Sequence, residues 1–490
     1  MSLYPRFNLA PYLALLITAA GVSIGLAAGF IVGVQPILLV VFFVAFTTLF
    51  FFFKDFEKTV LGLLILRSSL DIFSAQQLPA AFAIGIDILA LLYVAFKLIS
   101  RQKVQTDGFF YFFAGWVAIQ GLWVILLPLG GLGLGASALD DAIREWIRLF
   151  SFLMIYLLVL QLKEKISPEK AINALFLSLI APLTAACMQT FLPASLVPKI
   201  LLASASTGEI GTASRINGTL GHPNSFATFA LLFLGLTLWK FSYCRQRLPW
   251  ALLLAAVAFF LVATQSLTGL VMLLAFAIAF FLPRMSLVNL VAGTLLILIV
   301  GGLFLSSEAG QVRLNELYST PLLNPDIDWS RSVAMQLSSS SSQANSFNWR
   351  VTQWTFLLQS WEDFPILGYG LGTTKAVSIF HNAAHNDYIR ALVEGGIVGL
   401  SCFLVFLLAQ AIRLLQLRYA IPQSAARRDL CSMMLAFLAS MCVGMLAGNV
   451  VGQTPLWFYW CTLLSIVGWN WTQPSNHSDR ISHKSLQPEN

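Results

Sequence analysis

The segment HNDYIRALVEGGIVGLSCFLVFLLAQAI, residues 385–412, joins a cluster of polar side chains directly to a long apolar run. The run from Gly395 to Ile412 carries no charged residue and approaches the length of about 20 residues that a helix needs to cross a bilayer. The six residues that open the segment supply an imidazole, an amide, a carboxylate, a phenol and a guanidinium. A polar cluster at a membrane surface is where a lipid-carried substrate can meet a water-borne one. The segment therefore predicts a membrane helix with a functional site at its mouth.

The whole chain has the composition of a membrane protein. Of its 490 residues 58% are hydrophobic and only 10% are charged, and the mean hydropathy is +0.79, whereas soluble domains hold about 25% charged residues. Recurring apolar runs predict an all-α, polytopic transmembrane helix bundle of about 13–14 spans. We expect these spans at roughly 10–30, 36–53, 59–74, 82–99, 109–128, 143–162, 171–191, 223–241, 249–264, 266–283, 287–305, 395–412, 430–450 and 455–471.

The distribution of lysine and arginine predicts the orientation of the chain, because cytoplasmic loops are enriched in basic residues. The segments that this rule assigns to the cytoplasm hold 19 of the 29 basic residues, and the other ten lie on the opposite face. With 14 spans both termini are cytoplasmic. Omitting the span at 59–74, which is short and contains Arg67, would break this parity. The N-terminus lacks a small-residue cleavage site, so we expect a retained first span.

Two long loops fall on the outer face and divide the chain. The expected parts are N-terminal transmembrane helices (1–191), an extracytoplasmic loop (192–222), four transmembrane helices (223–305), a large extracytoplasmic loop (306–394), C-terminal transmembrane helices (395–471) and a cytoplasmic tail (472–490). The larger loop contains a serine run at 338–342 that predicts a flexible stretch. A short helix is expected around 348–361, where three tryptophans favour a position along the membrane surface.

Several kinds of site are disfavoured by the composition. Although the net charge is +7, the basic residues are scattered in short loops, so the chain offers no basic face for nucleic acid. The six cysteines provide neither a disulfide framework nor the spacing of metal ligands; they are Cys187, Cys244, Cys402, Cys431, Cys442 and Cys461.

Arg215 opens a glycine-rich turn that ends where the span from 223 begins. The backbone amides at the start of a helix attract anions, and a nearby arginine offers a two-pronged fork for phosphate oxygens. One interpretation of these features is a pyrophosphate clamp. The alternative is an interfacial arginine that binds lipid headgroups, which are also phosphates.

Arg350 could complete such a clamp. It precedes a segment with Pro365 and three glycines, Gly368, Gly370 and Gly372, which would allow a tight loop to approach a ligand closely. The alternative is a solvated helix face.

His385 is one of five histidines, and its imidazole is suited to accept a proton from a sugar hydroxyl near neutral pH. Asn386 or Asp387 can cap the following helix, and Asp387 could instead orient the imidazole. His381 lies four residues earlier, but with no third ligand at a clear spacing we expect no metal. The alternative is a histidine that is hydrogen-bonded in a loop.

Other charged residues carry weaker signals. Asp326 and Asp328 resemble the acidic pair with which some glycosyltransferases hold a metal, but the pattern is short. Five further ions lie within or at the ends of spans, where ions are costly and usually paired; they are Arg67, Asp87, Arg144, Glu145 and Arg148. They either line a cavity for lipid phosphate or form buried ion pairs, and the second interpretation is favoured.

Taken together these parts resemble the bacterial O-antigen ligase and polysaccharide polymerase family. The likeness rests on three blocks in the expected order: RINGTLGHPN at 215–224, Arg350 followed by PILGYGLG at 365–372, and HNDY at 385–388 leading to EGGIVGL at 394–400. The first 200 residues match only in having many spans.

The resemblance implies an inverting-type membrane glycosyltransferase whose donor is a glycan on undecaprenyl diphosphate. Its acceptor would be lipopolysaccharide core or a growing polysaccharide, at the periplasmic face of the bacterial inner membrane, without a cofactor. It implies that Arg215 and Arg350 hold the diphosphate and that His385 activates the acceptor hydroxyl. The polar neighbours expected to bind substrate are His222, Asn224, Asn386, Asp387, Tyr388 and Arg390.

The family is mixed, and other functions stay open. A chain-extending polymerase fits the long outer loop and the 14 spans at least as well as a ligase. A transporter of bicarbonate or another small anion could use the same arginines, but it should have a polar path to the cytoplasmic face. A non-catalytic assembly subunit should tolerate loss of its imidazole.

Overall fold

The computed structural model describes residues 36–205, 215–284, 311, 346–421 and 424–471. In these ranges the chain forms helices and no strands, and five helices are long and apolar enough to cross a membrane, which confirms an all-α, multi-pass membrane protein. The α-helices are α2 (Pro36–Lys54), α3 (Phe56–Leu66), α4 (Leu78–Ile99), α5 (Gly108–Leu129), α6 (Leu139–Leu160), α7 (Pro168–Leu175), α8 (Ile180–Phe191), α9 (Lys199–Ala205), α10 (Pro223–Tyr243), α11 (Leu248–Ala263), α12 (Leu267–Phe281), α16 (Ser346–Asp363), α17 (Thr374–Val377), α18 (Asp387–Tyr419), α19 (Ala425–Gly444) and α20 (Thr454–Val467).

The contacts divide the chain into two units, residues 1–62 and 63–490. In the first unit, α2 ends at Lys54, and Lys58 at the start of α3 pairs with Asp55 at 2.6 Å. The second unit contains every residue of the candidate site that the structure describes.

Side chains that cap helix ends explain where several helices begin. Asp107 accepts a hydrogen bond from the backbone N–H of Phe110 at 2.8 Å and starts α5. Ser266 accepts one from Gly269 and starts α12. Each cap satisfies a backbone donor that would otherwise lack a partner in the apolar environment of a bilayer.

The core of the larger unit is built around α6, α10 and α20. The second half of α6, from Leu149 to Leu160, is almost entirely buried, whereas its first turns carry acidic and basic residues. α6 packs against α4, α5 and α20, and α19 packs against α12 and α18. Between α5 and α18, Trp116 stacks on Phe406 with ring centroids 4.0 Å apart.

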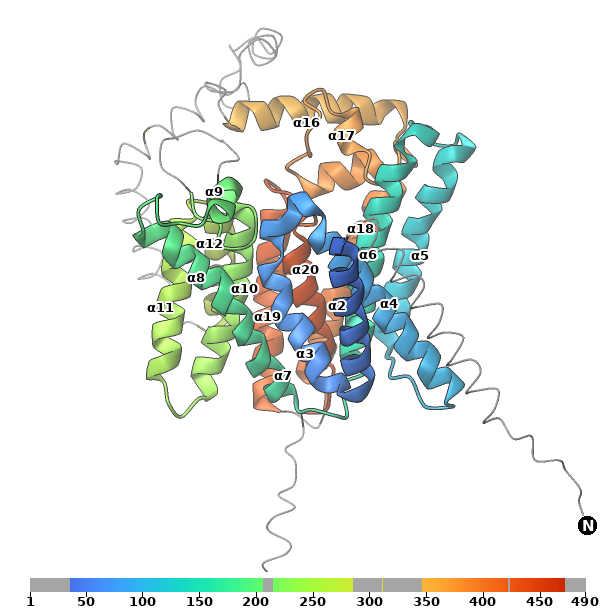
Figure 1. Cartoon of the computed structure of the whole chain (residues 1–490). Helices are drawn as coiled ribbons and strands as arrows, with labels where there is room; N and C mark the ends of the chain where they lie inside the picture. Colours follow the sequence, from blue (N-terminus) through green and yellow to red (C-terminus); the bar gives the residue numbers. More distant parts are fainter. Residues whose placement is uncertain (1–35, 206–214, 285–310, 312–345, 422–423, 472–490) are drawn as a thin grey trace, which may run out of the picture. The chain divides into compact units, whose positions relative to one another are not determined.

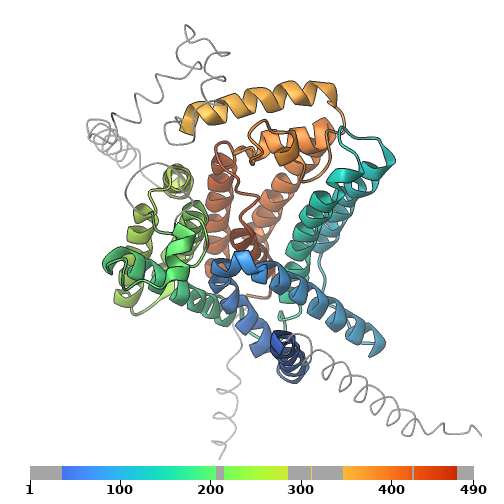
Figure 2. The ribbon, with the colours of Figure 1, turned by 45° about the horizontal axis from the view of Figure 1, so that its top comes forward.

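Many polar contacts of this unit lie at its two ends. At one end Asp107 pairs with Arg413 at 2.6 Å and accepts a hydrogen bond from the hydroxyl of Tyr156. The other end holds the connection between α19 and α20, the start of α18, and α16. Figures 1 and 2 both show α16 lying transverse to the bundle helices across this end. The predicted short helix at 348–361 is therefore present, with the longer bounds Ser346–Asp363.

Some expected spans differ from the observed helices; the helix of the span at 430–450, for instance, ends at Gly444. The span at 59–74 is a helix of only 11 residues, α3, which continues in 3-10 turns at Arg67–Ser69 and Asp71–Gln76. The span at 171–191 is confirmed as the helical stretch Pro168–Phe191, which is long and apolar enough to cross a membrane, although a 3-10 turn at Phe176–Leu179 interrupts it. The helix expected from 395 begins at Asp387. The spans expected at 10–30 and 287–305 lie outside the described residues.

α18 is broken at Gly396, whose φ of 64° is not helical. The break leaves carbonyls and amides of α18 without helical partners, and the segment 365–370 binds them. Tyr369 and Gly370 donate to the carbonyls of Val393 and Glu394, each at 2.9 Å, and Ile397 donates to Pro365 at 2.9 Å. The glycine-rich segment thus completes the hydrogen bonding of the broken helix.

Candidate functional site

His385 lies immediately before α18, in a left-handed backbone conformation with φ 52°. Its backbone N–H donates to Oδ1 of Asn449 at 2.8 Å, and its ring stands edge-on to Trp349 with centroids 5.3 Å apart. Burial, followed by the positive charges of Arg350 and His222, lowers the pKa of His385 from 6.5 to about 4. The imidazole is therefore neutral near pH 7 and able to accept a proton.

Arg350 reaches the site from α16. Its Nη1 donates to the backbone carbonyl of Ala447 at 3.3 Å, and its charge is the second cause of the lowered pKa of His385. The structure therefore brings Arg350 and His385 together, although 35 positions separate them in the sequence.

Arg215 is held against the starts of α10 and α12. Its Nε donates to the carbonyl of Thr264 at 3.1 Å and its Nη2 to Oδ1 of Asn224 at 3.2 Å, while Ser266 also donates to that oxygen at 2.8 Å. His222 caps α10 by accepting a hydrogen bond from Asn224. Because His222 also acts on the pKa of His385, the block of Arg215 lies beside the block of His385.

The residues after His385 have mainly structural contacts. Asn386 is the cap of α18 and accepts hydrogen bonds from the amides of Tyr388 and Ile389, each at 3.0 Å. Tyr388 donates its hydroxyl to the carbonyl of Cys442. Asp387 does not orient the imidazole, as one interpretation had it: its Oδ2 accepts from the amide of Val451 at 3.0 Å.

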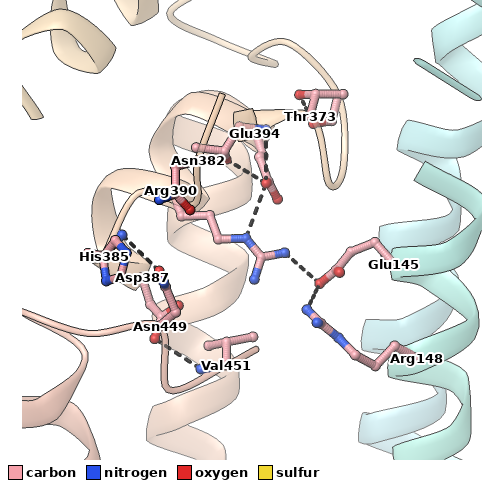
Figure 3. A network of polar contacts seen from close by, with 12 residues as sticks. Glu145, Arg148, Thr373, Asn382, His385, Asp387, Arg390, Glu394, Asn449 and Val451 are labelled. Carbon is pink, nitrogen blue, oxygen red and sulfur yellow. Dashed lines mark hydrogen bonds and ion pairs between the residues drawn. The ribbon is translucent and has the colours of Figure 1, made fainter. Parts of the chain in front are cut away.

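Arg390 is the centre of a buried charge network that joins α18 to α6 (Figure 3). Its guanidinium contacts Glu394 at 3.1 Å and Glu145 at 2.5 Å, and Glu145 also pairs with Arg148. The favoured interpretation of the charges in spans as buried ion pairs is therefore correct for Glu145 and Arg148. Such pairs in a bilayer avoid the cost of isolated ions.

Of the other charges in or near spans, one forms a buried ion pair and two do not. Arg67 is buried and pairs with Asp71 at 2.8 Å, so it too belongs to an ion pair. Arg144 is 80% exposed and lies 3.9 Å from Asp141. Asp87 is bound by the hydroxyl of Ser151 at 2.6 Å rather than by a cation.

A cavity of about 890 Å³ opens at this end of the larger unit. Its described lining includes Arg67, Arg144, Arg148, Lys375 and Arg390, together with the carboxylates of Asp71, Asp141, Glu145 and Glu394. Arg215, Arg350 and His385 are not among the described residues that line it, but their neighbours Gly221, Ala383 and Asn449 are. The cavity is thus large and lined by many charged side chains, and it lies close to the predicted catalytic residues.

A second, smaller cavity of about 70 Å³ lies deeper between α5, α6 and α18. Its walls are mostly apolar and include Trp116, Trp123 and Trp457. Glu145, Arg390 and Glu394 line both cavities, so the ion network lies between the larger cavity with its many charged side chains and the smaller apolar one.

Among the described residues no three histidine, cysteine or acidic side chains are grouped so as to hold a metal ion. The pair Asp326 and Asp328 lies outside the residues that the structure describes.

The contacts reveal further residues of the site that the sequence prediction did not include. Asn449 binds the backbone of His385, Ser266 binds Asn224, and the hydroxyl of Thr374 donates to Glu394 at 2.5 Å. Asn449 was placed inside the apolar span at 430–450. The nearby Gly448, Gly452 and Pro455 could have marked a connection there, because glycine and proline interrupt helices.

Comparison with known proteins gives one family match. A family model described as O-antigen ligase matches residues 250–404, from α11 to the middle of α18, and this confirms the resemblance found in the sequence. The matched range contains Arg350, His385 and Arg390; it begins after Arg215 and ends before Asn449. A search of curated proteins found no match.

Proposed function

From the O-antigen ligase domain at residues 250–404 we propose that this membrane protein transfers a glycan from undecaprenyl diphosphate to an acceptor hydroxyl. The observation that carries the proposal is the imidazole of His385, which is neutral at physiological pH and lies beside the guanidinium of Arg350. A base and a cation are the two groups that such a transfer requires.

In the proposed reaction His385 takes the proton of the acceptor hydroxyl. The acceptor oxygen forms a bond to the anomeric carbon as the bond from that carbon to the phosphate oxygen breaks, with inversion of configuration. The diphosphate leaves with its electron pair. A neutral imidazole is the competent form, and the lowered pKa keeps it in that form.

Arg350 and Arg215 would stabilise the charge of the leaving diphosphate. Arg215 is prepared for this role because Thr264 and Asn224 hold its guanidinium at the start of α10, where backbone amides also favour anions. Groups oriented before the reaction need not reorganise as charge develops. Arg390 and the polar neighbours of the three blocks are proposed to line the path of the substrates.

The described packing favours an enzyme over an anion transporter. A transporter needs a polar route between the two ends of the bundle. Below Arg390 the small cavity between α5, α6 and α18 has mostly apolar walls, which include the stacked pair Trp116 and Phe406 and the neighbouring Trp457, so it offers no such route. The proposed side of the reaction is the periplasmic face of the inner membrane.

Deletion of the gene, followed by gel electrophoresis of surface glycans, tests the proposal. Loss of a ligase should leave intact lipopolysaccharide core without any polymer ladder. Loss of a polymerase of the same family should instead shorten the polymer to single repeat units. Complementation with His385→Ala should reproduce the deletion pattern, because the base is missing, while the protein remains inserted in the membrane. Unchanged glycans with impaired uptake of an inorganic anion would contradict the proposal and support transport.

A further inference from the structure

The connection between α19 and α20, residues 445–453, touches both the base and one of the arginines of the proposed reaction. Asn449 Oδ1 accepts the backbone N–H of His385 at 2.8 Å, and the carbonyl of Ala447 accepts Nη1 of Arg350 at 3.3 Å. Figure 3 shows Asn449 and Val451 facing His385 and Asp387. These contacts come from a segment far from both residues in the sequence.

The same connection holds the chain on the C-terminal side of His385. The carbonyl of Met445 accepts the amide of Asp387 at 2.9 Å, and the carbonyl of Leu446 accepts Nδ2 of Asn386 at 3.0 Å. The amide of Val451 donates to Oδ2 of Asp387. The start of α18 is therefore bound by this connection at three successive residues.

His385 needs such support because its backbone is left-handed. A residue with a side chain adopts φ near 52° at a cost, so the conformation persists only where neighbouring contacts enforce it. Among the residues that the structure describes, the backbone N–H of His385 has its hydrogen-bond partner in Asn449.

The connection itself is anchored in the core. Val450 is fully buried, and its carbonyl accepts the indole N–H of Trp457 at 3.0 Å. Gln453 accepts a hydrogen bond from the hydroxyl of Thr228 on α10, the helix that begins at the His222 cap. An anchored support can hold an imidazole more precisely than a loop that moves freely.

We infer that Asn449 is a positioning residue, whose side-chain oxygen fixes the backbone of His385 so that its imidazole faces the acceptor hydroxyl beside Arg350. It acts through His385 and not on the substrate. It lies outside the matched range 250–404. The inference rests on the proposed function, because His385 is the proposed base.

The test compares three variants of the full-length protein in lipid nanodiscs, with lipid-linked glycan extracted from membranes as donor. Asn449→Leu removes the acceptor and should lower kcat about 10- to 100-fold with KM little changed, since small displacements of a catalytic group have effects of this size. Asn449→Asp keeps a side-chain oxygen at the same position to accept the backbone N–H of His385, and it should recover most of kcat. Asn173→Leu, at an exposed asparagine of α7, is the control and should behave like the wild type.

A second measurement does not depend on glycan transfer. The rate at which diethyl pyrocarbonate modifies His385 at pH 7, followed by peptide mass spectrometry, should rise in Asn449→Leu and not in Asn449→Asp or Asn173→Leu. Normal kcat and normal modification in Asn449→Leu would overturn the inference while leaving the proposed function intact. A wild-type protein that transfers no glycan would refute the function, and the modification rates would still decide the role of Asn449.

Discussion

At the scale of single residues, the protonation state of His385 determines what the site can do. Its lowered pKa has causes from three parts of the chain: burial at the start of α18, Arg350 on α16 and His222 at the start of α10. The last two are cations or can become cations, and a positive charge nearby disfavours imidazolium. The arrangement that would bind a diphosphate is therefore the one that also keeps the base unprotonated.

This pKa predicts the pH dependence of the reaction. A histidine with a pKa of about 4 is neutral at every pH above that value, so kcat/KM should stay constant from pH 8 down to about 5 and fall only near pH 4. An ordinary histidine would give the fall near pH 6.5. The measurement is kcat/KM of glycan transfer by purified protein over this range.

Replacing Arg350 provides the control for that profile. Arg350→Gln removes one cause of the lowered pKa, so the pH at which His385 becomes protonated should rise toward 6.5. The rate of modification by diethyl pyrocarbonate reports this even if transfer is lost. If kcat/KM of the wild type already fell near pH 6.5, this would contradict the explanation that burial and nearby positive charge lower the pKa of His385.

At the scale of elements, α18 carries the site because it is broken. The break at Gly396 exposes the carbonyls of Val393 and Glu394, and the segment 365–370 binds them with its own amides. We call these hydrogen bonds between α18 and the segment 365–370 the interlock. It positions Glu394 so that its carboxylate accepts hydrogen bonds from Thr374 and Arg390. Two of the three sequence blocks of the family resemblance thus meet at one joint.

The joint predicts that Gly396 cannot be replaced. A Cβ atom at this position would lie 2.1 Å from the carbonyl oxygen of Ile366, and φ of 64° is unfavourable for alanine. We expect Gly396→Ala to lower the free energy of unfolding by at least about 1–3 kcal/mol, the cost of such backbone strain alone. Thermal unfolding of the detergent-solubilised protein measures the effect.

Gly85 is the matched control, because it lies in α4 with nothing within 4 Å of the added atom. Gly85→Ala should be neutral or slightly stabilising, since alanine has the higher helix propensity. Equal stability of the Gly396→Ala and Gly85→Ala proteins would mean that the interlock is dispensable.

Hydropathy predicted the helices well wherever an apolar run was long, as in α4, α5 and α10. It misplaced the start of α18 by eight residues, because the first two turns carry Asp387, Arg390 and Glu394. Their charges are tolerated there since each has partners from other elements: Val451, Glu145 and Thr374. Such partners are not visible in a local hydropathy window.

At the scale of the whole molecule, the sequence alone pointed to the arginines and the histidine of the candidate site. It did not point to the residues that hold their backbones and side chains in place. The arginines and the histidine stand out because ions and imidazoles are rare in so apolar a chain. Asn449 and Ser266 are polar residues between helices or at their ends, like many others, and only the fold shows that their oxygens bind His385 and Asn224. The orientation of the bundle in the membrane stays a prediction from its basic residues.

That orientation can be measured by labelling single cysteines in a background without the six native ones. Ser137 is exposed in the 3-10 turn Ala136–Ala138, on the connection whose Gly133 binds Gly368 near the site. Gln246 is exposed between α10 and α11, at the opposite end of α10 from the His222 cap. Since basic residues favour the cytoplasmic side, a membrane-impermeant maleimide should label Ser137→Cys in intact spheroplasts and Gln246→Cys only after permeabilisation. A permeant maleimide should label both. The reverse pattern would place the arginines that we propose to bind the diphosphate on the cytoplasmic face, and the imidazole would then lie on the wrong side to meet an acceptor at the cell surface.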